Sequence, residues 1–483
     1  MNQIEKIKEK EKIALELEPT PSARREVTGK VFEYAGEFLD SLYDKPAFMT
    51  DHNHGRGLYD SPISDEPISI DTALDLIRTN VDEPALNPAS GGHVGYIAGG
   101  GIYPSALGDY LADISNNFAG VYYVAPGAVR MEHMLIRWMA DAIGFPETAG
   151  GDLTSGGSVA NLTGIVTARD ARGIKGSDVE NTVVYMSDHS HHSLRKALNI
   201  AGLRECVVRY VAMDKGLRMD PAALEKAIVA DRKSGLTPWL VIASGGTVDA
   251  GAIDPLSDIA DIAQSNGLWM HVDAAYGGFF ALTQTGKSRL AGIERADSVV
   301  MDPHKGMFLA YGTGALLVRD RAALHAAHSY QANYMQDSRE ADDEYSPADH
   351  SPELTRHFRG MRFWLPLKLF GVAPFRACLE EKLLLANYFY EEIKTIDGFE
   401  VGPRPELSVV TYRYVPKSGD ADAFNRRLVE EIQKDGRVFI TSTIIDEKVT
   451  LRLAVLCFRT HLNHIDLALE ILRDKARQLE SAS

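Results

Sequence analysis

A lysine follows an apolar strand pattern in the stretch DSVVMDPHKGMFLAYGTGALLV, which runs from Asp297 to Val318. The β-branched run Ser298-Val299-Val300 leads into Asp-Pro-His-Lys, and glycines and a second apolar run follow. A buried ammonium is unfavourable unless it is paired or neutralised. A neutral amine on Lys305 could instead attack a carbonyl and form a Schiff base, which explains its burial. The alternative is a strand-end lysine whose stem is covered and whose ammonium reaches water.

A glycine-rich segment, GGDLTSGGSVANLTG from Gly150 to Gly164, precedes a helical pattern. Gly156, Gly157 and Ser158 stand where this pattern begins. Glycines let backbone N–H groups approach an anion, and a helix N-terminus favours negative charge. Ser158 could cap the helix and also bind phosphate. Taken alone, the segment is explained more simply by an ordinary loop and a capped helix.

An acid ends an apolar strand pattern in LWMHVDAAYGG, from Leu268 to Gly278. Asp273 could pair with a protonated ring nitrogen of a cofactor, and Ala274 and Ala275 would let a flat ring lie against the chain. The alternative is an aspartate that caps the next turn.

Three histidines follow another strand pattern in YMSDHSHHSLRKA, from Tyr185 to Ala197. One of His189, His191 and His192 could stack on a flat ring and touch a substrate carboxylate. Metal binding is the rival, but no carboxylate or cysteine partner has convincing spacing. We expect two of the three to be solvated or to cap a helix.

These four segments together contain the parts of a pyridoxal phosphate site. The glycines would hold the phosphate, the aspartate would keep the ring nitrogen protonated, a histidine would stack, and the lysine would hold the aldehyde. We therefore predict pyridoxal 5'-phosphate as the cofactor and no metal.

Composition restricts the partners and the compartment. The chain has 483 residues and a net charge of −16, which disfavours nucleic acid because phosphate binding needs basic surface. Its three cysteines, Cys206, Cys378 and Cys457, lie far apart without disulfide or zinc spacing. The charged N-terminus lacks the apolar core of a signal peptide, and no stretch approaches a membrane span of roughly 20 apolar residues. We expect a cytoplasmic protein without a membrane partner.

Apolar strand patterns alternate with helical patterns between about residues 91 and 370. This alternation indicates an α/β fold, with a mostly parallel sheet covered on both faces and ligands at the carboxyl ends of its strands. The expected strands are 183–186, 206–211, 239–243, 268–272, 298–301 and 315–318, with helices at 193–201, 221–232 and 256–264.

Three regions are expected along the chain. Residues 1–90 are polar and helical and form an N-terminal arm, and residues 91–370 form the large cofactor-binding domain. Residues 371–483 form a small α+β C-terminal domain that begins with a long helix at 375–396.

The segments HVDAAYGG, ADSVVMDPHKG and LRLAVLCFRT in combination resemble the pyridoxal-phosphate-dependent group II amino acid decarboxylases. This family includes aromatic amino acid, tyrosine, tryptophan, histidine and glutamate decarboxylases. The resemblance extends from about Asn87 to Leu472. It implies the aspartate-aminotransferase type of fold (fold type I) and a homodimer with shared active sites, whose N-terminal arms wrap around the partner.

The resemblance also implies roles for particular residues. Lys305 would be the Schiff-base lysine, Asp273 the pyridinium partner, and His191 the stacking residue. Asp302 stands where some relatives have asparagine close to the phosphate, and an acid beside a dianion leaves its role open. The implied cofactor-binding set is Gly156, Gly157, Ser158, His191, Thr247, Asp273, Ala275, His304 and Lys305.

The polar, acidic stretch from Tyr334 to Leu354 has the composition of a disordered surface loop. In the family this region is a lid whose tyrosine protonates the α-carbon after carbon dioxide leaves. Tyr345 is the candidate for that tyrosine here. Relatives that form aldehydes oxidatively lack it, so its presence favours decarboxylation.

The substrate pocket departs from the family. Aromatic amino acid decarboxylases place bulky aromatics where this chain has Gly99 to Gly101, which implies a larger or differently shaped substrate. Two aromatics near residue 120 could reach the neighbouring subunit's pocket, or could simply pack at the interface. The candidate pocket residues are His93, Tyr96, Gly99, Gly100, Phe118 and Tyr122.

We therefore expect an enzyme that decarboxylates an L-amino acid to its amine. An aromatic substrate (tryptophan, tyrosine, phenylalanine or dopa) is the first expectation. The alternatives are a non-aromatic acid, such as an acidic or diamino acid, and an aldehyde-forming or lyase reaction with the same cofactor.

Overall fold

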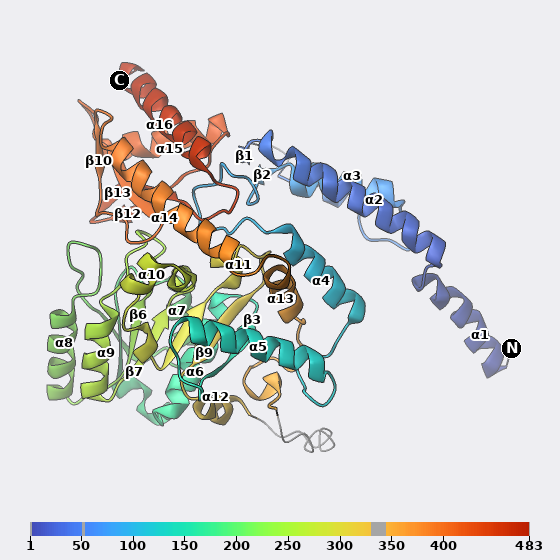
Figure 1. Ribbon diagram of the computed structural model, residues 1–483, viewed down its shortest axis with the longest axis horizontal. Coiled ribbons are helices and arrows are strands. Elements are labelled where there is room, and N and C mark those ends of the chain that lie inside the picture. Colours follow the sequence, from blue (N-terminus) through green and yellow to red (C-terminus); the bar gives the residue numbers. More distant parts are fainter. Residues whose placement is uncertain (1, 51–53, 330–343, 483) are drawn as a thin grey trace.

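The computed structural model describes residues 2–50, 54–329 and 344–482, and a seven-stranded sheet lies at the centre of its large domain (Figure 1). The strand order is β3-β9-β8-β7-β6-β4-β5, and β9 alone runs antiparallel to its neighbours. The mostly parallel α/β sheet predicted from the sequence is confirmed. The strands are β3 (Gly150–Thr154), β4 (Thr182–Met186), β5 (Val207–Tyr210), β6 (Thr237–Ser244), β7 (Trp269–Asp273), β8 (Ser298–Met301) and β9 (Gly314–Val318).

Both faces of this sheet are buried because successive side chains of each strand point in opposite directions. In β4, Val183 and Tyr185 join one apolar core, and Val184 and Met186 join another. The first core receives side chains from α5 (Pro126–Ala142), α8 (Pro221–Lys233), α9 (Leu256–Asn266) and α13 (Gly360–Phe370). The second receives them from α6 (Gly157–Ala171), α7 (His192–Ile200) and α12 (Arg321–His328).

Strand β3 is a strand that the sequence reading missed, because its residues were assigned to a loop. It pairs with β9 over its whole length, from Gly150 opposite Val318 to Thr154 opposite Gly314. A Cβ on Gly151 would lie 2.2 Å from the carbonyl oxygen of Leu316. Close backbone approach therefore requires glycine here, and glycine removes the apolar pattern by which strands are recognised.

The small domain packs three helices against a four-stranded antiparallel sheet of order β10-β11-β13-β12. Helix α14 contributes side chains both to this core, through Phe389, and to the large core, through Phe375. The chain near His93 bridges to Phe439, so a segment assigned to the large domain by sequence pairs with the small one. The elements are α14 (Ala373–Ile393), β10 (Phe399–Val401), β11 (Val409–Tyr414), α15 (Ala421–Asp435), β12 (Thr441–Ile445), β13 (Lys448–Ala454) and α16 (Leu462–Ala482).

The N-terminal arm projects away from both domains (Figure 1). It consists of α1 (Gln3–Ala14), α2 (Pro21–Asp40) and α3 (Ile70–Ile77), and none of their residues is buried. Helix α4 (Tyr103–Ser115) follows. Within the described ranges, no helix combines the length and the apolar character that crossing a membrane requires.

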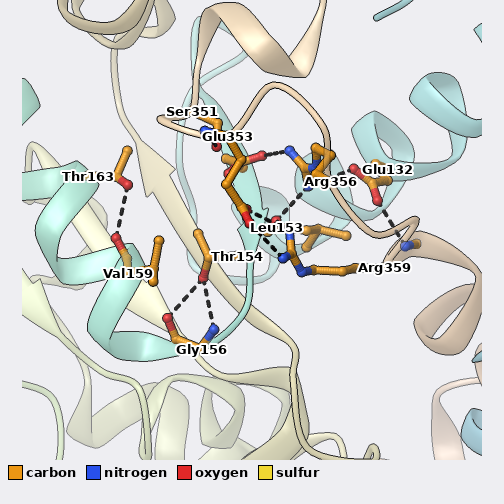
Figure 2. Close-up of polar contacts among 12 residues, drawn as sticks. Glu132, Leu153, Thr154, Gly156, Val159, Thr163, Ser351, Glu353, Arg356 and Arg359 are labelled. Atoms are coloured by element: carbon orange, nitrogen blue, oxygen red, sulfur yellow. Dashed lines mark hydrogen bonds and ion pairs between the residues drawn. The ribbon is translucent and has the colours of Figure 1, made fainter. Parts of the chain in front are cut away.

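Strand β3 is held in place by two buried arginines from the segment before α13 (Figure 2). Arg356 and Arg359 both donate to the carbonyl oxygen of Leu153. The Arg356 side chain is 0% exposed and pairs with Asp152 and, at 3.0 Å, with Glu132. Burial raises the pKa of Glu132 to about 7, although the neighbouring guanidinium opposes this shift. This arginine clamp positions the strand that leads directly into the glycine loop.

Replacing Arg356 with methionine is expected to lower the free energy of unfolding by about 3–5 kcal/mol, because it leaves buried carboxylates without a partner. Thermal and urea unfolding would measure the loss. Arg24→Met is the matched control, since Arg24 pairs with Glu18 at 3.0 Å while 52% exposed, and such surface pairs contribute little. Equal effects of the two substitutions would contradict a stabilising role for the clamp.

Candidate active site

A cavity of about 290 Å³ lies at the carboxyl ends of the central strands. It is bordered by residues that follow β3, β4 and β8 and by the last residues of β6 and β7. All nine residues predicted to bind the cofactor line it: Gly156, Gly157, Ser158, His191, Thr247, Asp273, Ala275, His304 and Lys305. Segments separated by up to about 150 residues in the chain thus meet where ligands of parallel sheets bind.

The glycine loop forms an anion cradle at the start of α6. The N-cap is Gly156 rather than Ser158, and no side chain caps the helix, which leaves first-turn N–H groups available to an anion. The Thr154 hydroxyl hydrogen-bonds to Gly156 and shapes the loop (Figure 2). A Cβ on Gly157 would lie 2.9 Å from Asp302 Oδ2, so this position requires glycine.

His304 adds a buried donor to the same cavity. Its Nδ1 has no hydrogen-bond partner among the described residues. Burial lowers the pKa of His304 most, while the nearby Asp302 carboxylate opposes the shift. An unsatisfied buried nitrogen beside an uncapped helix N-terminus fits the phosphate of pyridoxal phosphate.

Lys305 is paired with Asp302, whose role the sequence left open. Lys305 Nζ lies 2.9 Å from Asp302 Oδ2, and Asp302 is 1% exposed. Burial by itself lowers the pKa of Lys305, but attraction to Asp302 and a hydrogen bond with it give a net raised pKa. Without a bound aldehyde the lysine is thus an ammonium ion, held by the one carboxylate at hydrogen-bonding distance within the described part of the chain.

Asp273, the last residue of β7, points its carboxylate into the cavity wall. The backbone N–H of Ala275 donates to Oδ1 at 3.1 Å, and Asn161 Nδ2 donates to Oδ2 at 2.9 Å. Both contacts stabilise the charged form that a protonated ring nitrogen needs. Sequence reasoning missed Asn161; its position one helical turn after the glycine loop is the signal that could have indicated it.

His191 caps α7 and lines the cavity. Its Nδ1 accepts the backbone N–H of Ser193 at 3.3 Å and lies 2.7 Å from the Ser193 hydroxyl. Burial lowers the pKa of His191, so its imidazole is neutral near pH 7. His192 is exposed, whereas His189 also lines the cavity. The described residues include no cluster of three or more histidine, cysteine or acidic side chains suited to a metal.

Thr247 and Ala275 are the remaining predicted cofactor-binding residues that line the cavity. The Thr247 hydroxyl accepts the N–H of Ala252 at 3.1 Å, which shapes the turn after β6. Ala275 packs its Cβ near Gly157 and leaves a flat wall beside Asp273.

The predicted substrate-pocket residues do not line this cavity. A Cβ on Gly99 would lie 2.6 Å from His304 O and 2.7 Å from Lys305 O, and one on Gly100 would lie 2.6 Å from Cys457 Sγ. Other atoms fill the space beside Gly99 and Gly100, so these two glycines add no room to the cavity of this chain. Gly99 instead lets the chain approach the backbone that carries the lysine.

The aromatic candidates also lie elsewhere. His93 is 1% exposed and stacks on Phe439 with ring centroids 5.7 Å apart, and Tyr96 packs on the same ring. Tyr122 is buried below the guanidinium of Arg130. Phe118 is half-buried in the same connection between α4 and α5.

Tyr345 does not line the cavity. It stacks between His133 and His350, with ring centroids 3.8 Å and 4.0 Å apart, and Arg321 lies over its ring. Burial raises the pKa of the Tyr345 hydroxyl. Of the predicted lid, Tyr334 to Leu354, residues 334–343 lie outside the described residues.

The anion cradle, the buried acid, the neutral histidine and the lysine fit the four parts of pyridoxal phosphate and define a pyridoxal-phosphate enzyme of fold type I. A family model, the pyridoxal-dependent decarboxylase conserved domain, matches residues 59–415, and the chain belongs to this family. It is therefore an amino acid decarboxylase with pyridoxal phosphate as its cofactor, as the sequence predicted.

Three known proteins show how far the similarity extends. An aromatic-L-amino-acid decarboxylase of Bacillus atrophaeus is 34% identical over 387 residues, 79% of each chain. A phenylacetaldehyde synthase of Arabidopsis thaliana is 26% identical over 479 residues, 96% of this chain and 98% of that protein. The crystal structure of Oryza sativa TDC with PLP and tryptamine superposes with a TM-score of 0.90 at 24% identity, covering 96% of this chain and 99% of that one.

Asp302→Asn is expected to lower the pKa of Lys305, because it removes the carboxylate that stabilises the ammonium. At a fixed neutral pH more of the amine is then uncharged, so pyridoxal phosphate should react with the apo protein faster, by about tenfold for each pKa unit. Stopped-flow absorbance across a pH series would measure this. Asp320→Asn, an exposed helix cap where asparagine also caps, is the control. If the pH at which the reaction rate reaches half its maximum is unchanged or raised in Asp302→Asn, the assigned role of Asp302 is contradicted.

Proposed function

We propose that this enzyme decarboxylates aromatic L-amino acids to the corresponding amines. The observation that carries the proposal is the single cavity in which Lys305, Asp273, His191 and the glycine loop meet, in a chain of this family. Pyridoxal phosphate, when bound there, supplies the electron sink for the bond that breaks as carbon dioxide leaves.

Each side chain has a distinct task in this proposal. Lys305 would hold the cofactor's aldehyde as the neutral amine, and Asp302, 2.9 Å away, holds the ammonium form until its proton has left for solvent. Asp273 would hold a proton on the ring nitrogen, and Gly156, Gly157, Ser158 and His304 would hold the phosphate. His191 would offer a neutral N–H to the substrate carboxylate, and His191 and Ala275 would hold the cofactor's ring.

The aromatic substrate class is supported by two observations. The Bacillus atrophaeus relative, by its name, acts on aromatic L-amino acids. Among the described residues, the cavity lining includes no arginine, and Lys305, its one lysine, is paired with Asp302. A distal carboxylate, as in an acidic substrate, would therefore lack a charge partner there, whereas an apolar ring needs none.

An aldehyde-forming reaction is the second candidate. The Arabidopsis thaliana relative matched over 96% of this chain is a phenylacetaldehyde synthase. Amine and aldehyde products therefore have to be measured separately in any assay.

Purified protein loaded with pyridoxal phosphate is expected to release carbon dioxide from one or more of tryptophan, tyrosine, phenylalanine and dopa. A screen of all proteinogenic acids plus dopa, with products identified by mass, would measure this. Lys305→Ala should abolish release. Release only from a non-aromatic acid would contradict the substrate class, and aldehyde with ammonia and peroxide would support the second candidate.

The proton donor to the α-carbon is a separate prediction. Tyr345 lies outside its own cavity, so it could act only after movement or in the site of a second copy. Its stretch contains one more tyrosine, Tyr334. Tyr345→Phe should slow amine formation by about 100-fold or more if it is the acid, as expected for general acid catalysis. Tyr334→Phe is the matched comparison, and loss of amine formation in that variant alone would reassign the role.

We also infer a homodimer whose active sites lie at the interface. Helices α1 and α2 bury no residue, yet they expose apolar side chains such as Ile4, Ile7 and Phe32. Isolated helices of this length are marginal in water, so a second copy that covers the arm would stabilise them. The three free cysteines are consistent with a reducing compartment such as the cytoplasm.

Light scattering is expected to give about twice the single-chain mass of 53.0 kDa. Deleting residues 1–45 should shift the equilibrium toward the monomer, because the arm's apolar side chains then lose their partner. A full-length protein that has the mass of one chain at assay concentration would contradict the dimer.

A further inference from the structure

A continuous chain of buried hydrogen bonds runs beneath the cofactor cavity. Trp269 Nε1 donates to the Ser298 hydroxyl at 2.8 Å, and that hydroxyl lies 2.8 Å from His271 Nδ1. His271 Nε2 lies 2.9 Å from Asn161 Oδ1. His271 and Ser298 are 0% exposed and Asn161 is 1% exposed, so no water competes for these bonds.

The chain divides at Asn161. Its amide nitrogen donates to Asp273 Oδ2 at 2.9 Å and to the Ser193 hydroxyl at 3.2 Å. The Ser193 hydroxyl in turn lies 2.7 Å from His191 Nδ1. One amide on α6 therefore contacts the acid on β7 and, through a serine on α7, the histidine of the cavity.

Three groups at the ends of this network determine which partner donates in each hydrogen bond. The Trp269 indole can only donate, and the Asp273 carboxylate can only accept. The backbone N–H of Ser193 donates to His191 Nδ1, so that nitrogen carries no hydrogen and must accept the serine hydroxyl as well.

These ends orient the residues between them. The asparagine amide faces Asp273 and Ser193, so its oxygen accepts a hydrogen from His271 Nε2. His271 Nδ1 then accepts the Ser298 hydroxyl, which agrees with a neutral His271 whose pKa burial lowers to about 4.

We propose that Asn161 is the positioning residue of this active site: it holds the Asp273 carboxylate and, through Ser193, keeps His191 as the neutral tautomer with its hydrogen on Nε2. The inference rests on the roles proposed above for Asp273 and His191. Asn161 borders the cavity, and its assigned role is to act through Asp273 and His191. Its effect is to couple the acid at the ring nitrogen to the histidine at the ring face, so that both are oriented before the cofactor arrives.

The first test uses apo protein and needs no substrate. Nitrogen-15 NMR of histidine-labelled protein should show His191 with an unprotonated Nδ1 and a protonated Nε2, with the signal assigned by its loss in His191→Gln. A hydrogen on Nδ1 of His191 in the wild type would overturn the proposal. A failed substrate screen would leave this result unaffected, so the two failures are distinguishable.

The second test measures the dissociation constant of pyridoxal phosphate by fluorescence titration. Asn161→Ala should weaken binding about tenfold or more, the range for one hydrogen bond to a charged group. Asn161→Asp keeps the shape and the acceptor for His271, removes both donors and adds a carboxylate beside Asp273, so it should weaken binding at least as much. It also provides a test if the alanine variant does not fold.

Thr163→Val is the matched control, since Thr163 is buried on the same helix and, among the described residues, its hydroxyl bonds to Val159 O of its own helix. It should leave the His191 NMR signal unchanged and the dissociation constant of pyridoxal phosphate within about twofold of the wild type. Asn161→Ala and Ser193→Ala should be non-additive in their effect on the His191 signal, as expected for one connected chain. Additive effects, or Asn161 variants that leave the His191 signal and the dissociation constant unchanged, would overturn the proposal.

Discussion

The active site depends on one constraint: charged groups must be buried at the ends of apolar strands without being left unpaired. Asp273 is the last residue of β7 and Asp302 directly follows β8, and the apolar side chains of both strands fill the two cores. Burial without partners would be strongly unfavourable. Asp302 is paired with Lys305, and Asp273 receives two hydrogen bonds, one of them from Asn161. The surrounding polar side chains satisfy Asp273 and one oxygen of Asp302, whose Oδ1 has no hydrogen-bond partner among the described residues.

Close backbone approach is the second physical requirement, and glycine meets it. Gly314 on β9 faces Gly156 and Asp302, where a Cβ would lie 2.5 Å from the Gly156 carbonyl carbon. Gly99 lies against the carbonyl oxygens of His304 and Lys305. These glycines bring the loop, the acid and the lysine together, and the cavity is the space that remains for a flat ring and its phosphate.

Local pattern was enough to predict much of the fold. The alternating strands and helices from residue 182 to 318 form with boundaries within about two residues, because each strand is a short apolar run between turn residues. Strand β3 was missed because glycine at Gly150 and Gly151 carries no hydrophobic pattern. The residues predicted to bind the cofactor line one cavity because most of them follow strands of the sheet, whose carboxyl ends lie at a common edge.

The sequence by itself determined the chemical inventory: a lysine, an acid, histidines and a glycine loop, each adjacent to a predicted strand or helix. Only the tertiary structure decided which of these groups meet. Asn161, Ser193 and His271 lie up to about 110 residues apart in the chain, and their hydrogen bonds depend on how α6 and α7 cross the sheet. The tertiary structure also shows that Gly99 packs against backbone atoms and that Tyr345 lies between two histidines. Residue type and spacing are local properties, whereas close contacts across elements depend on packing that no local pattern encodes.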